Sequence, residues 1–418
     1  MMSLDLGWVR TQFPALTQEI NGQPLVFCDG PGGTQVPWTV IEAMSDYLIT
    51  SNANAHGAFV TSARTDAAID SAHAAAADLL GCDRDEVVFG PNMTTLTFAL
   101  SRAIARELQP GDEIVVTRLD HDANITPWTV LAEQGAVIRF VDINPADCTL
   151  NLEELEQQLN QQTRLVAVGY ASNAVGTIND VAAVVRLAHA VGALVFVDAV
   201  HAMPHIPVDV RSLDCDFLAC SAYKFFGPHV GILYGKREHL TQLQPYKLRP
   251  ASDQVPYRWE TGTQNHEGLA GLVAAINYLA ELGRRLAPTA KTRRDALLTA
   301  MEEIYNYERE LSEVLVDGLL QIPGLTLYGI TEPTRFHWRT PTLAIRHTQH
   351  DPRMLATALG DRGICTWNGN YYALHLTERL GVEASGGMLR VGLVHYNTVE
   401  EVHRLLKALE AIAVPAST

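Results

Sequence analysis

The stretch SAYKFFGP, residues 221–228, places a lysine among aromatic side chains just before a Gly-Pro turn. Lysine is rare in this chain, with five among 31 basic residues, and the other four lie in polar or turn-like surroundings. A lysine that loses contact with water has a lowered pKa and becomes a nucleophilic amine. From its local context alone, Lys224 is equally consistent with a surface lysine that extends to solvent from a strand end.

Asp198 ends an apolar stretch, ALVFVDAV, and two histidines follow it closely, His201 and His205. A carboxylate in that place is often the partner of a cationic ring nitrogen in a ligand. The three residues could also ligate a metal ion, or the carboxylate could only orient a nearby helix. Pro204 interrupts the helix that would bring both histidines to one face, which argues against a metal site.

The stretch GPNMTTLTFAL begins a helix directly after a predicted strand, EVVFG. The backbone N–H groups of residues 92–95 would point at a bound anion there, and a threonine hydroxyl would make the helix start a phosphate site. A plain helix N-cap would have the same sequence.

Other polar side chains follow predicted strands or interrupt them. His121, in RLDHDANITPW, could be a general base, a ring that stacks on a planar ligand, or a hydrogen-bonded loop histidine. Asn173 could donate to a ligand oxygen or cap a turn. Arg390 is a lone arginine in an apolar strand, GMLRVGL, and a substrate carboxylate fits its bidentate fork.

These residues must be positioned by a sheet, and the chain predicts one between residues 68 and 235. Apolar, β-branched stretches alternate there with helical patterns, which is typical of an α/β fold with a mostly parallel sheet between helices. The seven predicted strands are 86–90, 112–118, 136–143, 164–172, 193–200, 216–222 and 230–235. Ligands of such folds collect at the carboxyl ends of the strands.

The rest of the chain predicts a second, smaller α/β domain. It is mostly helical after residue 267 and mixes short strands with helices after residue 324. We expect a large domain over residues 20–285 and a small C-terminal domain over 286–418, with the segment 1–19 packing near it.

Composition excludes several classes of function. The net charge of −16 argues against nucleic acid or an anionic membrane surface as a partner. No apolar stretch approaches the length of a membrane span, and the first residues lack a signal peptide's apolar core, so we expect a cytoplasmic protein. The six cysteines show no metal or disulfide spacing.

Taken together, the candidates are an amine, a carboxylate, a phosphate site, a stacking ring and a carboxylate-binding arginine. Pyridoxal 5'-phosphate (PLP) chemistry requires this set of groups. The chain also resembles the class V aminotransferase family of fold type I PLP-dependent enzymes, and in particular its cysteine desulfurase-like branch. The resemblance rests on motifs in the family's order: GPNMTT, LDHDANITPW, SNAVGTIND, VDAVHAMPH, CDFLACSAYKFFGP, WETGTQN and MLRVGLVHYNT.

The resemblance implies roles for the central residues. Lys224 would form the imine with the cofactor and then act as acid and base at the substrate Cα. Asp198 would pair with the pyridinium nitrogen, and His121 would stack on the ring. Asn173 and His201 would contact the phenolic oxygen.

The resemblance also implies how the phosphate is held. Thr94, the backbone beside Met93, and Ser221 would bind it, together with Tyr223, which replaces the family's usual histidine. Thr263 matches a residue that reaches the phosphate of the neighbouring subunit in relatives. This implies a homodimer with shared sites.

The substrate side of the site departs from typical desulfurases. Arg390 would hold the α-carboxylate with Asn173 beside it, but His56 stands where relatives commonly have arginine. Tyr372 aligns with the cysteine that attacks the substrate sulfur, and a phenol cannot carry a persulfide. Cys365, seven residues earlier, is a possible substitute, although no electropositive neighbour marks it as activated.

The sequence therefore predicts an enzyme that acts on an amino acid by desulfurase-like C–S lyase chemistry without the usual nucleophilic cysteine. Transamination of an amino acid is the alternative, and a non-catalytic relative that binds PLP or a partner protein is a further one.

Overall fold

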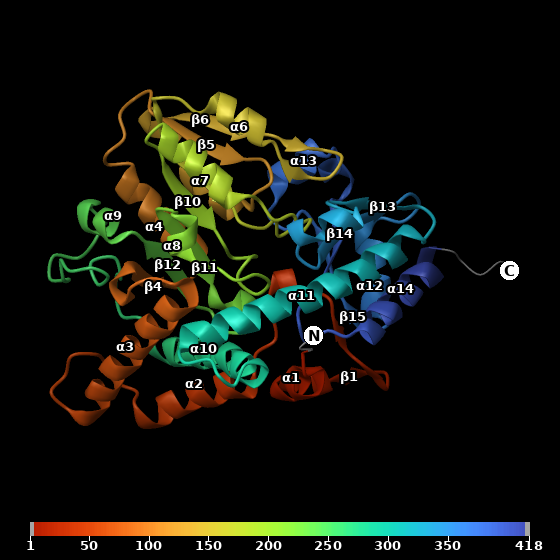
Figure 1. Ribbon diagram of the computed structural model, residues 1–418, viewed down its shortest axis with the longest axis horizontal. Coiled ribbons are helices and arrows are strands. Elements are labelled where there is room, and N and C mark those ends of the chain that lie inside the picture. The colour runs from red at the N-terminus through yellow and green to blue at the C-terminus, as the bar shows by residue number, and fades with distance from the viewer. Residues whose placement is uncertain (1–3, 414–418) are drawn as a thin grey trace.

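The computed structural model describes residues 4–413. Its large part is a seven-stranded sheet between two layers of helices, and all seven predicted strands are present (Figure 1). In spatial order these strands are β4 (Val87–Gly90), β12 (Gly231–Gly235), β11 (Phe217–Ser221), β10 (Leu194–Asp198), β9 (Thr163–Gly169), β5 (Glu113–Thr117) and β6 (Val137–Val141). Only β12 runs against its neighbours, so the prediction of a mostly parallel sheet is confirmed.

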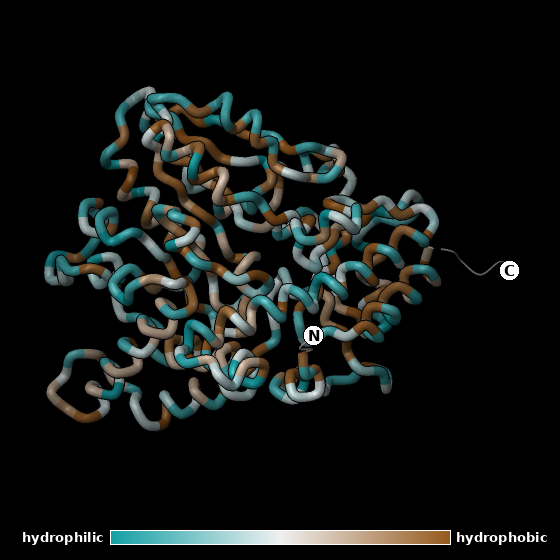
Figure 2. Tube along the Cα trace, in the orientation of Figure 1, coloured by the Kyte–Doolittle hydropathy of each residue, from teal (hydrophilic) through white to brown (hydrophobic). Residues whose placement is uncertain are grey.

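Both faces of this sheet are buried, which explains why its strands are almost uninterrupted apolar runs. Val195 and Val197 point into one core, while Phe196 between them points into the other. The hydrophobic strands at the centre of the molecule are visible in Figure 2. The helices of this part of the chain are α2 (Trp38–Thr50), α3 (Val60–Leu80), α4 (Met93–Ile104), α5 (Thr126–Thr129), α6 (Leu152–Gln158), α7 (Val181–Ala190), α8 (Val210–Leu213), α9 (Arg237–Gln242) and α10 (His266–Leu286).

The C-terminal part has an antiparallel sheet of four strands covered by helices. Its strands, in spatial order, are β13 (Leu325–Tyr328), β14 (Thr342–His347), β17 (Met388–Gly392) and β16 (Trp367–Gly369). Its helices are α12 (Pro352–Gly360), α13 (Leu374–Arg379) and α14 (Val399–Ala413). Three strand pairs complete the structure: β1 (Glu19–Ile20) with β2 (Gln23–Pro24), β3 (Val26–Phe27) with β15 (Ile364–Cys365), and β7 (Ile143–Asn144) with β8 (Thr149–Leu150).

Helix α11 (Arg293–Leu320) belongs to both parts. Ile304 and residues before it pack into the core of the large sheet, whereas Leu311 and residues after it pack into the core of the small one. The predicted boundary at residues 285/286 precedes this shared helix, and the division into two domains stays a prediction.

The N-terminal helix α1 (Leu6–Gln12) packs near the C-terminal part. Arg10 donates to the carbonyl of Tyr396 and lies 2.9 Å from Glu401. Phe13 contacts the Phe226 ring of the SAYKFFGP stretch edge-on, with 5.7 Å between the centroids. The beginning of the predicted segment 1–19, residues 1–3, lies outside the described residues.

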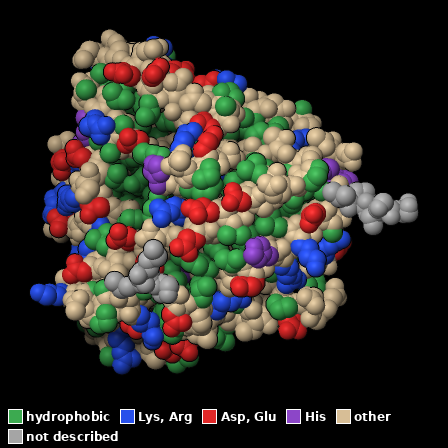
Figure 3. Space-filling model, turned by 45° about the vertical axis from the view of Figure 1, so that its right-hand side comes forward, with side chains coloured by type: hydrophobic (Ala, Val, Ile, Leu, Met, Phe, Trp, Pro, Cys, Tyr) green, Lys and Arg blue, Asp and Glu red, His purple; other side chains and the backbone are tan. Residues whose placement is uncertain are grey.

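The surface carries side chains of both charges. On the face in Figure 3, acidic and basic side chains are interspersed. Within residues 4–413, every helix is too short or too polar to cross a bilayer.

Candidate active site

A cavity of about 1130 Å³ opens where the large sheet meets the C-terminal part. Its walls include the segments that follow β4, β5, β9, β10 and β11, at the carboxyl ends of these strands as expected. All the predicted site residues except two line this cavity: Met93, Thr94, His121, Asn173, Asp198, His201, Ser221, Tyr223, Lys224, Tyr372 and Arg390.

Lys224 projects into the cavity from a 3-10 turn that directly follows β11. Burial, together with the positive charge of Arg390, lowers the pKa of its amine to about 7. Its Nζ donates to the carbonyl of Pro31 and lies 4.6 Å from the centre of the Tyr223 ring. A large fraction of this lysine is therefore a neutral, nucleophilic amine near pH 7, and it is not a solvated surface lysine.

The turn that carries Lys224 is held by buried aromatic side chains. Phe225 and Phe226 are fully buried, and Phe226 has a left-handed backbone with φ of 70°. The Phe226 N–H donates to Thr34 Oγ1 at 2.8 Å, and the Gly227 N–H donates to the Ala222 carbonyl at 2.9 Å. These contacts fix the direction of the lysine.

Two buried carboxylates lie in the cavity floor. Burial raises the pKa of Asp198 to about 6, and its Oδ1 accepts from the Val200 N–H at 2.9 Å. Asp120, which the sequence analysis missed, has its pKa raised to about 7 by burial and by the charge of Asp198. It accepts from the Gly169 N–H at 2.9 Å and from Asn124 Nδ2 at 2.7 Å. Its position directly before His121 at a strand end was the available signal.

His121 and Tyr372 form a stacked pair at the cavity. Their ring centroids are 5.3 Å apart with an interplanar angle of 22°. Burial, with the charge of Lys224, lowers the pKa of His121 to about 4, so its ring is neutral at pH 7. Its Nδ1 accepts from the Ala123 N–H at 3.0 Å. Tyr372 is 72% exposed and marks the cavity entrance.

Arg390 is held in a fixed orientation by two neighbours. Its Nη1 donates to the Asn173 carbonyl at 2.9 Å, and its guanidinium carbon lies 4.4 Å from the centre of the Tyr371 ring. The Asn173 side chain in turn donates to the Tyr371 carbonyl at 2.9 Å. Burial lowers the Arg390 pKa to about 10, so the side chain stays cationic at pH 7. The sequence analysis did not predict that Tyr371 packs on Arg390.

The start of α4 forms another part of the cavity wall. Asn92 is its N-cap and accepts from the Thr95 N–H at 2.9 Å, while the Met93 N–H donates to Ser221 Oγ at 2.9 Å. The N-cap interpretation is therefore correct, and Met93 and Thr94 also line the cavity. Helix starts of this kind attract anions.

His201 and His205 lie closer together than the interruption by Pro204 predicts. Successive turns over residues 199–206 bring the two rings within 4.9 Å despite the proline. The ring nitrogens bond elsewhere, however: His201 Nε2 lies 3.1 Å from Thr340 Oγ1, and His205 Nδ1 lies 2.7 Å from Glu308 Oε2. In the described part of the chain, no three His, Cys, Asp or Glu side chains are grouped as metal ligands.

Thr263 and His56 lie outside the cavity of their own chain. Thr263 is exposed, and the His56 side chain is 82% exposed and lies 3.2 Å from Asp66. Their predicted contacts with cofactor and substrate remain predictions.

The cavity fits PLP by the chemistry of its donors. The Asn173 Oδ1 and Arg390 Nε atoms are buried without a partner among residues 4–413, and both side chains line the cavity. Near pH 7, the cavity offers a neutral amine for the aldehyde of PLP, a carboxylate for its pyridinium nitrogen and a helix N-terminus for its phosphate.

Comparisons with known proteins agree with this chemistry. The model of the family "Aminotransferase class-V" matches residues 26–405. A cysteine desulfurase from Pectobacterium atrosepticum is 34% identical over 428 aligned residues, covering 98% of each chain. A cysteine desulfurase structure from Thermococcus onnurineus superposes with a TM-score of 0.87 at 26% identity over 99% of both chains. The cysteine desulfurase CsdA from Escherichia coli gives 0.83 at 28% identity, covering 98% of this chain and 99% of the other. The chain therefore belongs to the class-V aminotransferase family and is a PLP-dependent enzyme, a lyase or a transferase.

Proposed function

We propose that this enzyme breaks a C–S bond of an amino acid by β-elimination, a desulfurase-like lyase reaction without a nucleophilic cysteine. The observation that carries the proposal is the composition of the cavity wall. It contains a buried lysine and a fixed arginine, and none of the cysteines, all of which lie within residues 4–413, lines it.

The roles follow from the contacts of each residue. Arg390 holds the α-carboxylate, because its orientation is already set by Asn173 and Tyr371. Bound PLP withdraws electrons from the substrate Cα. Lys224 Nζ accepts the Cα proton, which its lowered pKa permits at neutral pH. The C–S bond breaks with its electron pair on sulfur, and the released sulfide or thiolate takes up a proton. Water then hydrolyses the remaining enamino acid to pyruvate and ammonia.

We assign the remaining residues by their positions. Asp198 and His121 would hold the cofactor's ring, and His201 and Asn173 would contact its phenolic oxygen. Met93, Thr94, Ser221 and Tyr223 would hold the phosphate.

Tyr372 and Cys365 support elimination over sulfur transfer to the protein. Tyr372 stacks on His121 at the entrance, and we take it to stand at the position of the desulfurases' nucleophile. Cys365 belongs to β15, which pairs with β3, and burial raises the pKa of its thiol. It is therefore a poor thiolate at neutral pH.

The expected products test this proposal. Cysteine and its S-substituted derivatives should give a thiol or sulfide, ammonia and pyruvate in equal amounts, without alanine. Cys365→Ala should leave this rate within about twofold, since the thiol takes no part. Alanine with protein-bound sulfur, abolished by Cys365→Ala, would contradict the proposal, and so would a 2-oxo acid that retains the substrate's side chain.

We further propose that the enzyme is a homodimer in which Thr263 and His56 reach the partner's site. Apolar side chains are exposed along α2 and the start of α3, including Trp38, Ile49 and Phe59. These helices lie at the lower left in Figure 1. An exposed apolar surface of this kind is typical of a subunit interface.

Charge introduced into this surface should separate the subunits. Ile49→Asp is expected to shift the mass in solution from dimer to monomer, because it buries an unpaired carboxylate in the interface. Leu320→Asp is the matched control, since Leu320 is also an exposed apolar side chain but lies on α11. A wild-type monomer, or a dimer unaffected by Ile49→Asp, would rule out this interface.

The six unpaired cysteines fit our further proposal of a reducing, cytoplasmic location.

A further inference from the structure

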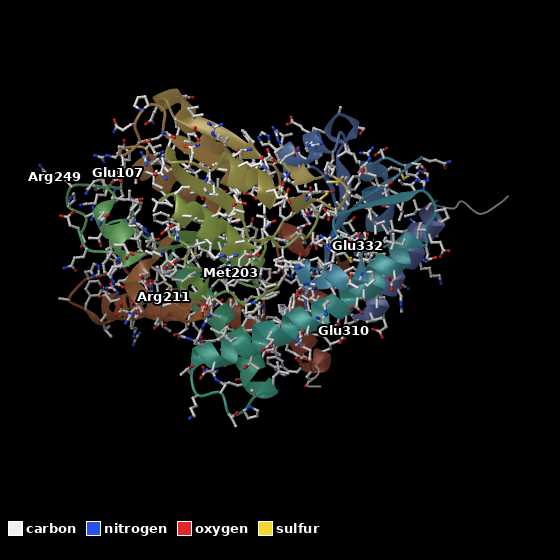
Figure 4. All side chains as sticks on the ribbon, turned by 45° about the horizontal axis from the view of Figure 1, so that its top comes forward. Glu107, Met203, Arg211, Arg249, Glu310 and Glu332 are labelled. Carbon is white, nitrogen blue, oxygen red and sulfur yellow. The ribbon has the colours of Figure 1, made fainter. Side chains whose placement is uncertain are left out.

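A cluster of buried polar side chains lies behind the cavity wall, and we call it the Glu308 cluster: Glu308, His205 and His395. His205 Nδ1 lies 2.7 Å from Glu308 Oε2, and each of these two residues is 1% exposed. Glu310, two residues further along α11, is exposed and is labelled at the surface in Figure 4. Helical residues two apart point in nearly opposite directions, so Glu308 points into the protein.

The location of this pair is costly for stability. Taking a carboxylate and an imidazole out of water carries a desolvation penalty that a buried contact often fails to offset. Burial raises the pKa of Glu308 accordingly. Two apolar side chains of similar volume would fill the same space without this penalty, so stability alone does not explain the pair.

The cluster meets both of the segments that carry the active-site residues. The His205 ring is 4.9 Å from the ring of His201, which lines the cavity and follows Asp198 by three residues. His395 follows Arg390 by five residues, and burial, with the nearby His205, lowers its pKa to about 3. The His395 backbone lies close enough to Glu308 to oppose the burial-induced rise in its pKa, so the cofactor-side segment and the substrate-side segment both adjoin Glu308.

Few other hydrogen bonds fix the rings of this cluster, although the His395 ring also packs edge-on against Phe226 with 4.6 Å between centroids. Glu308 Oε1, His205 Nε2 and His395 Nδ1 are buried and have no hydrogen-bond partner within residues 4–413. His395 Nε2 lies 2.6 Å from the Tyr278 hydroxyl, and His201 Nε2 lies 3.1 Å from Thr340 Oγ1. The orientation of the His205 ring thus depends on its contact with the Glu308 carboxylate.

We propose that Glu308 is a positioning residue that acts through His205. It fixes the cavity segment that carries His201 relative to β17, the strand that carries Arg390. Glu308 does not line the cavity. Without its charge, the hydrogen bond to His205 weakens, the His205 ring is held less firmly, and the His201 ring beside it is less well supported. The effect should appear in binding of the cofactor and of the substrate carboxylate more than in the rate of the chemical step.

Glu308→Gln tests this inference, because glutamine retains the volume and an oxygen acceptor but not the charge. Titration of the apo-protein with PLP, followed by absorbance, should show a Kd about tenfold higher than that of the wild type. KM for the amino acid should rise as well, with kcat changed less than KM. His205→Asn should give the same pattern, and it replaces Glu308→Gln in the test if that variant does not fold.

Asp216 supplies the matched control. It is also a buried carboxylate bonded to histidines, His189 at 2.9 Å and His239 at 3.0 Å, but it precedes β11 at the end opposite the cavity. Burial opposes ionisation there, but these bonds hold its pKa below the usual value, so the charged form stabilises the fold at neutral pH. Asp216→Asn should lower the urea midpoint and leave the PLP Kd unchanged.

The PLP Kd and the KM of these variants distinguish the possible outcomes. Folded Glu308 and His205 variants with wild-type Kd and KM would overturn the inference, as would an equal loss of PLP binding in Asp216→Asn. A wild-type protein that fails to bind PLP would instead count against the family's cofactor chemistry, before the variants are compared.

Discussion

Replacing Lys224 by alanine is expected to lower kcat by about 10⁴-fold, since no other amine lines the cavity within residues 4–413 to accept the Cα proton. Bound PLP should also lose its covalent attachment to the protein. Reduction of the loaded wild type with borohydride, followed by peptide mass analysis, should place the cofactor on the peptide that contains Lys224. The variant should yield no labelled peptide.

The lowered pKa adds a pH signature to this prediction. As the pH rises through about 7, the Lys224 ammonium loses its proton and the amine becomes free to react with the cofactor's aldehyde. Attachment of PLP to the apo-protein should therefore be half-maximal near pH 7, more than three units below an exposed lysine. Lys407→Ala, at an exposed lysine on α14, is the control and should behave as wild type. Labelled peptide or substantial turnover in Lys224→Ala would refute the assignment.

The sequence predicted the sheet well because burial of both faces leaves a strong local pattern. Each strand of the large sheet is a short apolar run, and the polar residues that end these runs, such as Asp198 and Lys224, must meet at one edge of the sheet. Local pattern was therefore sufficient for most of the cavity lining.

What the sequence could not predict depends on contacts between distant segments. His205 and Glu308 are 103 residues apart, and Asn173 and Arg390 are 217 apart. No local pattern indicates which pairs meet, because the packing of the two sheets determines it. The left-handed backbone at Tyr371 and Tyr372 is likewise unexpected, since neither residue favours positive φ.

Arg390→Lys is expected to raise KM for the amino acid by about 30- to 100-fold while kcat changes far less. Lysine retains the positive charge but cannot offer two parallel donors to a carboxylate. It also loses the flat contact with the Tyr371 ring that fixes the guanidinium. Steady-state kinetics with the best substrate from the product assay measures both constants.

Two further variants show whether substrate binding depends on the fixed guanidinium group of Arg390 or only on its positive charge. Tyr371→Ala leaves Arg390 in place but removes the ring beneath it, so KM should rise by a smaller factor, about three- to tenfold. Arg362→Lys alters an exposed arginine whose side chain donates to the Ala358 carbonyl, and both constants should stay at wild-type values. If Arg390→Lys lowers kcat and leaves KM unchanged, the arginine acts on the reacting atoms and does not dock the carboxylate. Wild-type kinetics in Arg390→Lys would mean that the α-carboxylate is bound elsewhere in the cavity.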